Sequence, residues 1–208
     1  MIKIPSRLFA AVYDRMNAPV EEAGGRELRR GLLAGAEGAT LEIGAGTGAN
    51  LEHYPAAVTR LVLLEPEAPM AAKLRARLAT AGREAEVVAG SADPLPFASA
   101  TFDTAVVTLV LCTVPDQAAA LAEVGRVLKP GGRLLFLEHV RSEDERIARR
   151  QDRVRPIWNV VGRGCNPNRD TLAALEASPL DVEAVEHGRL PKAAGIVEPL
   201  LIARARRA

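Results

Sequence analysis

The stretch Thr40-Leu-Glu-Ile-Gly-Ala-Gly-Thr-Gly-Ala-Asn50 determines how the chain around it folds. Leu41 to Ile43 is a short apolar run that predicts a buried strand, and apolar residues at helical spacing follow the stretch. Between them stand glycines at alternate positions, Gly44, Gly46 and Gly48. Glycine lets the backbone turn sharply and approach a ligand, and a helix N-terminus offers free N–H groups. The stretch therefore predicts a strand, a turn and a helix that meet a nucleotide-like ligand.

Two details of this stretch argue against NAD as that ligand. The glycine spacing is G-x-G-x-G, whereas the dinucleotide fingerprint is G-x-G-x-x-G. An acid, Glu42, stands on the strand ahead of the glycines, where its carboxylate can hold the ammonium group of an amino-acid-bearing cofactor. With Glu42 the stretch resembles the cofactor-binding motif of class I S-adenosylmethionine (SAM) methyltransferases. A glycine cluster alone is also compatible with an ordinary turn, so the motifs further along the chain are needed.

The composition predicts one domain without a strong overall charge. A chain of 208 residues is long enough for a single domain, residues 1–208, with a sizeable core. The formal net charge is +1, so no overall field recruits nucleic acid or an anionic membrane. Residues 1–16 have neither the apolar core of a signal peptide nor the ~20 apolar residues of a membrane span. We therefore expect no nucleic-acid partner and no membrane span.

Two cysteines, Cys112 and Cys165, occur in the chain, and there is no C-x-x-C pair. This usage predicts neither a disulfide framework nor a zinc site, and we expect no metal. A reducing cytoplasm is the location that such cysteine usage favours. A monomer and a homodimer are both compatible with the sequence.

The N-terminal region, residues 1–38, is predicted to be helical. Pro19 is expected to end a first helix, and residues 21–33 to form a second one. The inward residues of the two helices are expected to be Leu8, Phe9, Val12 and Met16, then Leu28, Leu32 and Leu33. These helices either pack on the core or form a lid over the cofactor, with Tyr13 near the site.

Strands and helices then alternate along the chain. Apolar runs predict strands at residues 41–43, 60–65, 84–89, 102–111 and 133–140. Helices are predicted at residues 50–54, 67–80 and 116–128, the last with Asp116 as N-cap and residues 130–132 as its end. Repeated strand–helix units of this length indicate a doubly wound, Rossmann-like α/β sheet, whose strands end at one edge where ligands bind.

The C-terminal tail departs from this alternation. Residues 180–186 and 198–204 are two predicted strands that residues 188–195 join without a helix. Such a pair favours an antiparallel hairpin that closes a sheet of seven strands. A plain Rossmann dehydrogenase would not end in this way, whereas a class I methyltransferase sheet does.

Residues 141–179 form an insertion after the fifth strand. Ser142-Glu-Asp-Glu145 has the spacing of a capping box, and a charged helix is expected from there to Pro156. Its arginines are interpreted as a solvated face: Arg146, Arg149, Arg150 and Arg153. The only tryptophan, Trp158, stands beyond this helix among glycines, ahead of a predicted helix at 171–177. We expect the insertion to bind the substrate, with Trp158 packed over the acceptor.

Residues at the predicted strand ends supply the candidate cofactor contacts. Glu65 ends the second strand, where a carboxylate can accept both ribose hydroxyls. Ser91 ends the third strand beside the adenine, and Thr108 ends the fourth beside the methionine moiety. The full set of candidates is Glu42, Gly44, Ala45, Gly46, Gly48, Asn50, Glu65, Pro66, Ser91, Ala92, Thr108 and Leu109.

The acceptor side of the same edge has its own candidates. His139 ends the fifth strand and is the candidate catalytic base, since its reference pKa is ~6.5; a structural histidine bonded to a carbonyl is the alternative. Cys112 is interpreted as a small apolar pocket residue, because no paired base stands near it in the sequence. The candidate substrate contacts are Tyr13, Cys112, His139, Trp158, Cys165 and Asn166.

The motifs along the chain resemble class I methyltransferases of the ubiquinone/menaquinone C-methyltransferase type. The most characteristic are Leu95-Pro96-Phe97, Phe102-Asp103 and Leu128-Lys-Pro-Gly-Gly132. The resemblance implies SAM as the cofactor and S-adenosylhomocysteine as its product. Those enzymes usually carry Asp-Ala after the strand-three glycine, whereas Ser91 precedes Ala92 here.

A narrower resemblance is to the thiol S-methyltransferases of the mammalian methyltransferase-like family. It rests on the glycine stretch followed by Tyr54-Pro55, on Thr108-Leu-Val-Leu-Cys-x-Val114, on Glu138-His-Val140, and on Pro156-x-Trp158 with Gly164-Cys-Asn166 and Arg169. Ala45 and Leu172 replace a cysteine and a tryptophan of that family. This resemblance implies methylation of a small thiol.

Methyl transfer from a sulfonium is an in-line displacement, so the protein mainly supplies proximity, alignment and a dry site. A thiol of pKa ~8.5 is partly ionised near neutral pH, whereas a phenol or hydroxyl requires a general base. The alternative function is C-, O- or N-methylation of a quinone precursor, natural product or lipid head group. A NAD-dependent oxidoreductase and a non-catalytic SAM-binding protein are weaker alternatives.

Overall fold

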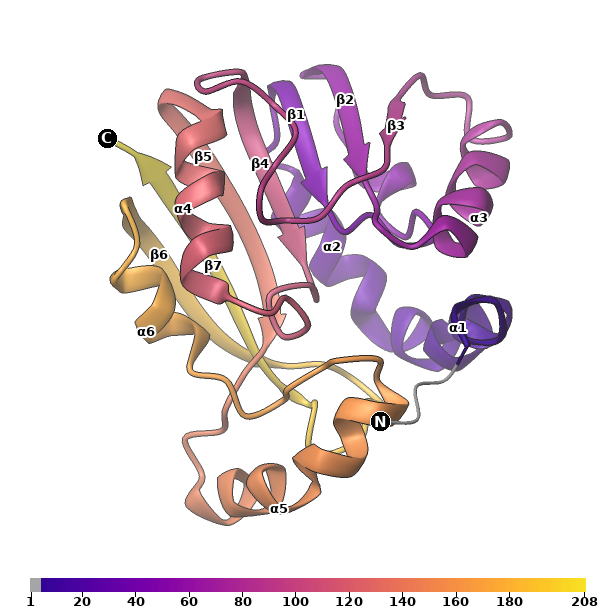
Figure 1. Ribbon diagram of the computed structural model, residues 1–208, viewed down its shortest axis with the longest axis vertical. Coiled ribbons are helices and arrows are strands. Elements are labelled where there is room, and N and C mark those ends of the chain that lie inside the picture. The colour runs from indigo at the N-terminus through magenta and orange to yellow at the C-terminus, as the bar shows by residue number, and fades with distance from the viewer. Residues whose placement is uncertain (1–4) are drawn as a thin grey trace.

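The computed structural model of the protein describes residues 5–208 and has one mixed sheet flanked by helices (Figure 1). The strands are β1 (Gly38–Ile43), β2 (Val58–Leu64), β3 (Glu86–Val88), β4 (Phe102–Thr108), β5 (Leu128–His139), β6 (Leu180–Arg189) and β7 (Pro199–Arg207). The α-helices are α1 (Ser6–Val20), α2 (Arg26–Leu33), α3 (Ala68–Leu78), α4 (Gln117–Val127), α5 (Glu145–Val161) and α6 (Thr171–Glu176). A π-helical segment, η1 (Glu21–Gly25), links α1 to α2, and a short 3-10 helix, η2 (Leu51–His53), follows the glycine stretch.

The sheet has the order β3-β2-β1-β4-β5-β7-β6, which confirms the predicted seven-stranded α/β fold. Strands β1 to β5 pair in parallel, and β7 runs antiparallel to both β5 and β6, as the terminal hairpin requires. Ile43 at the end of β1 lies opposite Leu64 of β2 and Val107 of β4. Three strands therefore end level at one edge of the sheet, and the glycine stretch leaves β1 there.

Hydrophobic clusters cover both faces of the sheet. On β5, Leu134 and Phe136 belong to one cluster, whereas Leu135 and Leu137 belong to the other. Helices α4 and α6 pack on the first face, and α2 and α3 on the second (Figure 1). Alternate residues of a strand point to opposite faces, so burial on both faces explains the unbroken apolar runs in the sequence.

Several element boundaries differ from the prediction by a few residues. β3 and β4 are shorter, and β5 begins earlier because Leu128 already pairs with Phe102. Residues 130–132 therefore lie within β5 and do not end α4. The predicted N-cap of α4 is confirmed, since the Asp116 carboxylate accepts the N–H of Ala119 at 3.1 Å.

Helix α1 does not end at Pro19, contrary to the prediction. It continues to Val20, and the chain bends only at Gly24, where φ is 133°. Proline removes one N–H and crowds the preceding turn, which a helix tolerates near its end when a wider π-helical segment follows. Glycine at the bend supplies the positive φ that the change of direction requires.

Of the four residues expected to point inward from α1, Leu8, Val12 and Met16 face solvent, and Phe9 is partly buried. Leu8 and Met16 are 57% and 58% exposed, and Val12 is also exposed. The helix instead attaches through a polar residue: Asp14 accepts a hydrogen bond from Lys73 of α3 at 3.0 Å. The prediction was wrong because α1 lies over a polar cleft at the edge of the sheet and not over the hydrophobic core.

Helix α5 also departs from the prediction at both ends. Asp144 caps it in place of Ser142, because its carboxylate accepts the N–H of Arg146 at 2.7 Å, while the Ser142 hydroxyl accepts the N–H of Asp144 at 3.2 Å. A carboxylate next to the first turn is a stronger acceptor than a hydroxyl further out. The helix continues through exposed Pro156, so Trp158 lies on a helix. Its arginine face is exposed, as predicted.

Gln151 on α5 ties the insertion to the sheet from inside. Its side chain is fully buried, and Nε2 lies 3.0 Å from the carbonyl oxygen of Val140 and 2.9 Å from those of Pro167 and Ile196. Its Oε1 accepts the N–H of Ser142 at 2.9 Å. One amide group therefore joins the end of β5, the insertion and the loop of the terminal hairpin.

Replacing Gln151 with methionine is expected to lower the free energy of unfolding by about 2–4 kcal/mol, because several buried backbone groups lose their partner. Denaturant unfolding measures this change. The matched control is Arg153→Met on the exposed face of the same helix, where the expected change is within ~0.5 kcal/mol. Equal stability of the two variants would contradict the role of Gln151.

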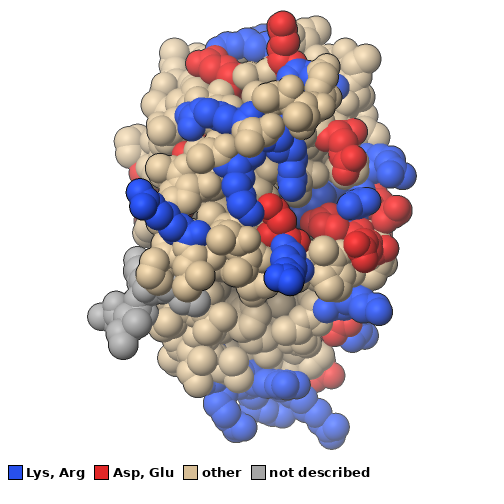
Figure 2. All heavy atoms as spheres, turned by 90° about the vertical axis from the view of Figure 1, so that its right-hand side faces the viewer, with Lys and Arg blue, Asp and Glu red and all other residues tan. Residues whose placement is uncertain are grey.

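The face that carries α1 and α3 has charges of both signs. Figure 2 shows Lys and Arg side chains lying beside Asp and Glu across this face. Within residues 5–208, no helix is both long enough and apolar enough to cross a membrane.

Candidate functional site

The glycines after β1 all adopt left-handed backbone, with φ of 68° at Gly44, 58° at Gly46 and 87° at Gly48. A Cβ on Gly44 would lie 2.5 Å from the Val110 side chain, and one on Gly48 would lie 2.8 Å from Leu51. Around Gly46, the nearest atom to such a Cβ would be 3.9 Å away. The loop therefore packs tightly against neighbouring side chains at Gly44 and Gly48, whereas the space beside Gly46 is open.

The helix predicted directly after the glycines is only the 3-10 helix η2, three residues long. It lies within the short helix predicted at residues 50–54, but a single 3-10 turn leaves little helix dipole to attract a ligand. The loop is held by the neighbouring strand instead: Ala45 donates its N–H to the carbonyl oxygen of Leu64 at 3.0 Å.

Glu65 stands immediately after β2 and faces the glycine loop. Its carboxylate accepts the N–H of Gly46 and the N–H of Glu67, both at 2.8 Å, and Pro66 between the two acids is exposed. Glu65 is only 5% exposed, and burial raises its pKa. The structure thus places this acid at the open part of the loop, where the sequence predicted the ribose contact.

A buried polar network lies beneath the loop. The Tyr54 hydroxyl donates to one carboxylate oxygen of Glu42 at 2.7 Å, and the Asn50 amide donates to the other at 2.8 Å. The same amide also reaches the Thr108 hydroxyl at 3.0 Å. Burial raises the pKa of Glu42 to about 7, although both hydrogen bonds act to lower it. The structure therefore brings together three predicted cofactor residues, Glu42, Asn50 and Thr108.

Glu42 is expected to make the stability of the protein depend on pH. An unfolded chain releases the proton of a glutamate near pH ~4.3, whereas folded Glu42 keeps it to about pH 7. Between these values the folded state holds more protons, so the contribution of Glu42 to the free energy of unfolding falls as pH rises. Above pH ~7 the loss is complete, on the order of 3 kcal/mol.

A Glu42→Gln variant has no proton to release at this position. The difference in unfolding free energy between the wild-type protein and the variant should therefore shrink by ~3 kcal/mol between pH ~4.5 and ~7.5. Urea unfolding at several pH values measures it. Glu138, whose pKa burial also raises to about 7, is present in both proteins and cancels. A pH-independent difference would refute the expectation.

Arg29 on α2 is a site residue that the sequence analysis missed. Its guanidinium is buried at the rim, where Nη1 donates to Asn50 at 3.0 Å and to Thr108 at 3.3 Å, while Nη2 pairs with Glu21 at 3.0 Å. The sequence does contain a signal for this position. Arg29 stands three and four residues before Leu32 and Leu33, so on a helix it lies on the same inward face as these two core leucines. A cation on the apolar face of a helix requires a buried partner.

The predicted adenine contacts lie at the outer margin of the site. Ser91 is exposed, and its hydroxyl donates to the carbonyl oxygen of Asp93 at 2.8 Å within its own loop. Ala92 is partly buried. Leu109, after β4, has a positive φ of 59° and donates its N–H to Leu137 at 2.8 Å. These residues border the same edge as the glycine loop but take no part in the network beneath it.

A cleft of about 540 Å³ lies between α1, the glycine loop and the C-terminal end of α3. Tyr13 and Arg29 line it from the N-terminal helices, and Gly48 from the loop. Neither Glu65 nor Leu109 lines it, so the cleft adjoins the predicted cofactor surface and is not identical with it. Burial raises the pKa of Tyr13, which Arg29 acts to lower.

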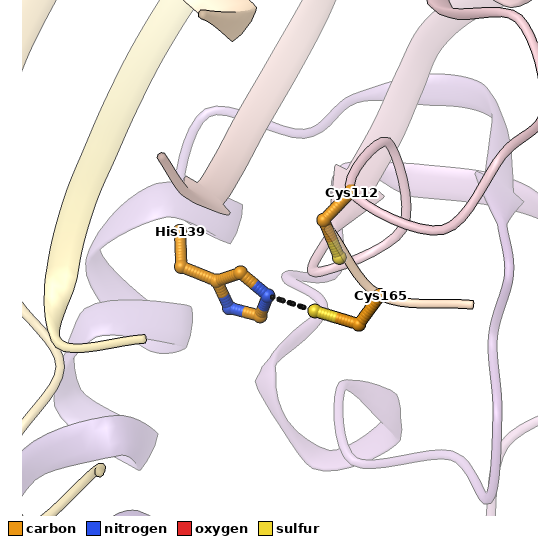
Figure 3. A group of neighbouring side chains, drawn as sticks. All are labelled: Cys112, His139 and Cys165. Atoms are coloured by element: carbon orange, nitrogen blue, oxygen red, sulfur yellow. Dashed lines mark hydrogen bonds between the residues drawn. The ribbon is translucent and has the colours of Figure 1, made fainter. Parts of the chain in front are cut away.

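The predicted acceptor residues form a cluster at the ends of β4 and β5 (Figure 3). His139 Nε2 lies 3.0 Å from Cys165 Sγ, and the Trp158 indole N–H donates to the same sulfur at 3.3 Å. Cys112 Sγ lies within 4.8 Å of both other ligand atoms. Asn166 donates its backbone N–H to the carbonyl oxygen of Cys112 at 2.9 Å. All five predicted acceptor residues outside α1 therefore lie side by side.

Proton positions in the cluster follow from its hydrogen bonds. The hydrogen bond from Cys112 is the largest cause that lowers the pKa of Cys165 to about 5, and His139 and Trp158 lower it further. The same hydrogen bond, together with burial, raises the pKa of Cys112. Burial acts to lower the pKa of His139, but the contact with Cys165 raises it overall. Beside a Cys165 thiolate, His139 is better suited to donate a proton than to accept one.

Glu138 supports the turn that carries Cys112. It is fully buried at the end of β5, and its Oε1 accepts the N–H of Val110 and, at 2.7 Å, the N–H of Leu111. Its Oε2 has no hydrogen-bond partner among residues 5–208. The carboxylate thus fixes the backbone on which Cys112 stands.

Comparison with solved structures identifies the class of protein that has this fold. The chain resembles a SAM-dependent methyltransferase of Thermotoga maritima described as a possible histamine N-methyltransferase, with a TM-score of 0.74 and 20% identity over 97% of each chain. It also resembles the N-methyltransferase NodS of Bradyrhizobium japonicum, solved with S-adenosylhomocysteine, with a TM-score of 0.66 and 22% identity over 91% of this chain and 88% of that one. The fold is that of the class I SAM-dependent methyltransferases.

Sequence comparison identifies the family. The family model for a methyltransferase domain matches residues 41–136. Human thiol S-methyltransferase TMT1A is 33% identical over 92% of this chain and 80% of that protein, and human TMT1B is 39% identical over 81% and 72%. The C-methyltransferase UbiE of a Marinomonas species is 34% identical over 72% of this chain and 64% of that protein. The chain belongs to the SAM-dependent methyltransferases, and it is an enzyme that methylates a small molecule.

Proposed function

We propose that this methyltransferase transfers the methyl group of SAM to the sulfur of a small thiol. The observation that carries the proposal is the group of two buried sulfurs and a partly buried imidazole, Cys112, Cys165 and His139, at the proposed acceptor side of the strand ends. Sulfur side chains are polarizable and suit a soft sulfur acceptor. The similarity to human thiol S-methyltransferases supports the same acceptor atom.

The residues of the glycine loop and β2 fit the cofactor. Gly46 leaves open space where a side chain would stand, and Glu65 beside it offers a carboxylate for the ribose hydroxyls. Ser91 and Ala92 border the adenine position. Bound SAM supplies a methyl group already activated on a sulfonium. The protein therefore has to hold the acceptor in line and exclude water.

Charges of opposite sign mark the methionine end of the proposed cofactor site. Glu42 is an acid beneath the loop, and Arg29 is a cation at the rim, joined through Asn50. An amino acid carries an ammonium and a carboxylate on one carbon, which is the matching arrangement. We assign the ammonium to the Glu42 side and the carboxylate to Arg29.

The acceptor lies between two segments in this proposal. Of the predicted lid, residues 1–38, the described part from residue 5 covers the site with Tyr13 on α1, and residues 1–4 lie outside the described residues. Residues 141–179 supply Trp158, Cys165 and Asn166. Trp158 packs over the acceptor. A thiol needs no strong base, because its sulfur is already partly ionised near neutral pH. A cytoplasmic enzyme, as a monomer or homodimer in a reducing environment, agrees with two cysteines that are both free.

A panel of methyl acceptors tests the proposal. Release of S-adenosylhomocysteine is measured with alkyl thiols, quinone precursors, phenols and amines at equal concentrations. We expect turnover of at least one thiol and a rate for thiols that rises with pH, because the thiolate is the nucleophile. Turnover of a quinone precursor, phenol or amine without any thiol would instead establish C-, O- or N-methylation.

A further inference from the structure

Two thiols and an imidazole converge in this protein from three distant segments. Cys112 follows β4, His139 ends β5, and Cys165 follows α5, yet their ligand atoms all lie within 4.8 Å of one another. Figure 3 shows the His139 ring and the two sulfurs pointing toward a common space. Cys112 and Cys165 are 1% and 6% exposed. Such a set, brought together by the fold and shielded from water, is the donor arrangement of a metal site.

The backbone around the cluster is held in place from outside. Glu138 fixes the turn that carries Cys112, through the N–H groups of Val110 and Leu111. Asn166, next to Cys165, donates its N–H to the carbonyl oxygen of Cys112 and so locks the two cysteine segments together. Outer contacts of this kind orient the ligands of metal sites.

Two buried polar atoms at the cluster have no hydrogen-bond partner within residues 5–208. They are Nδ1 of His139 and Oε2 of Glu138. A buried polar atom without a partner is costly, so natural proteins rarely keep one without a further group or water nearby. Both atoms belong to residues that stand next to each other at the end of β5. Nε2, and not Nδ1, is the ring nitrogen that lies against Cys165 Sγ, so the unpartnered atoms do not themselves mark the position of a metal ion.

We propose that Cys112, His139 and Cys165 bind one zinc ion and leave its fourth coordination position open to the acceptor. Zinc accepts this mixture of thiolate and imidazole ligands, and catalytic zinc sites keep three protein ligands with one open position. Zinc–sulfur bonds of about 2.3 Å and zinc–nitrogen bonds of about 2.0–2.1 Å set tetrahedral donors about 3.5–3.8 Å apart. All three ligand atoms lie within 4.8 Å of one another, and His139 Nε2 and Cys165 Sγ, which are 3.0 Å apart, would separate by about 0.5 Å to hold the ion.

The catalytic role of the ion, though not the metal site itself, rests on the proposed thiol function. The acceptor thiol binds at the open position as a thiolate, and its proton passes to water. Its sulfur then forms a bond to the methyl carbon while the bond from that carbon to the cofactor sulfonium breaks, and the electron pair stays on the cofactor sulfur. Zinc is neither oxidised nor reduced. The methylated product is a neutral thioether, a poorer zinc ligand than a thiolate, so it leaves.

Metal analysis of the full chain tests the site. The protein is purified under reducing conditions, incubated with micromolar zinc and desalted, and its zinc content is measured by mass spectrometry. We expect about one zinc per chain, and less than ~0.1 in each of Cys112→Ser, His139→Ala and Cys165→Ser. The control His187→Ala removes an exposed histidine and should retain the full zinc content. SAM binding by every variant confirms that it is folded.

Two results of the metal analysis would overturn the site, and a third would overturn the choice of zinc. A wild-type protein that binds no zinc, or a Cys165→Ser variant that binds it as well as the control, removes the site. A different metal at full occupancy removes the assignment to zinc.

Activity separates the metal site from the thiol function. Chelation should lower thiol methylation at least ~10-fold, with recovery on adding zinc but not magnesium. If zinc binds at one per chain but no thiol is methylated, the site stands and the thiol function falls. If metal-free protein methylates thiols at the full rate, the thiol function stands and the catalytic role of zinc falls.

Discussion

A Gly46→Val variant will fold but will bind SAM at least ~100-fold more weakly than the wild-type protein, a loss of about 2.7 kcal/mol. Gly46 stands at the open part of the glycine loop, with φ of 58° and no atom closer than 3.9 Å to the place that a Cβ would take. The Cβ of a valine would therefore make only ordinary van der Waals contact with Met70 and Gly44, and the side chain would occupy the space proposed for the cofactor. Isothermal titration with SAM and with S-adenosylhomocysteine measures the loss.

A control has to separate the effect of backbone strain at position 46 from the steric effect of the valine side chain on SAM binding. A β-branched residue at positive φ costs about 1–2 kcal/mol wherever it stands. Gly82, after α3, has φ of 64° and no atom within 4 Å of its Cβ position, so Gly82→Val carries similar strain away from the site. We expect Gly82→Val to bind SAM normally. Equal losses in both variants would show that strain, and not the loop, causes the effect.

The second large effect is expected at Glu65. Its carboxylate can accept both ribose hydroxyls, whereas the amide of Glu65→Gln offers only one acceptor oxygen. Hydrogen bonds to a charged group contribute about 1.5–3 kcal/mol, so the variant should bind SAM ~10–100-fold more weakly. The loss should be similar for S-adenosylhomocysteine, because both molecules carry the same ribose.

A deoxyribose analogue of S-adenosylhomocysteine shows whether Glu65 acts through the sugar. The analogue should bind the wild-type protein weakly. It should bind the Glu65→Gln variant only slightly more weakly than that, because the substitution and the missing hydroxyl remove the same contact. If the losses of binding free energy from the substitution and from the analogue are fully additive, Glu65 acts only by accepting the N–H of Gly46. The control is Glu86→Gln on β3, an exposed acid paired with Arg60 at 3.1 Å, which should leave cofactor binding unchanged.

The strands could be predicted because each parallel strand is buried on both faces. Leu134 to Leu137 of β5 alternate between two hydrophobic clusters, so the sequence shows an unbroken apolar run. The helix ends were harder to predict. Pro19 and Pro156 both lie inside helices, because flanking hydrogen bonds hold a helix together around one missing N–H. A rule that considers the proline alone does not include those neighbours.

The residues at the edge of the proposed cofactor site were largely predictable, and the proximity of the proposed acceptor residues only in part. Glu65 stands at a strand end, and topology alone places strand ends at one edge. Arg29 was missed because its partners, Asn50 and Thr108, come from other elements. Cys112 and Cys165 lie far apart in the sequence, and rules for metal sites look for closely spaced cysteines. Their proximity depends on how the insertion folds back onto β4 and β5.

The buried amide of Gln151 has a consequence for engineering this enzyme. It fastens the insertion to the sheet from within, through carbonyl groups of three separate loops, while the outer face of α5 is solvent-exposed. Gln151 is thus one of several inner contacts that hold the proposed acceptor wall, together with the hydrogen bonds from Asn166 to the carbonyl oxygen of Cys112 and from Arg169 to that of Leu111. A chimera that imports another wall can therefore change the exposed face of α5, provided that it keeps these inner contacts.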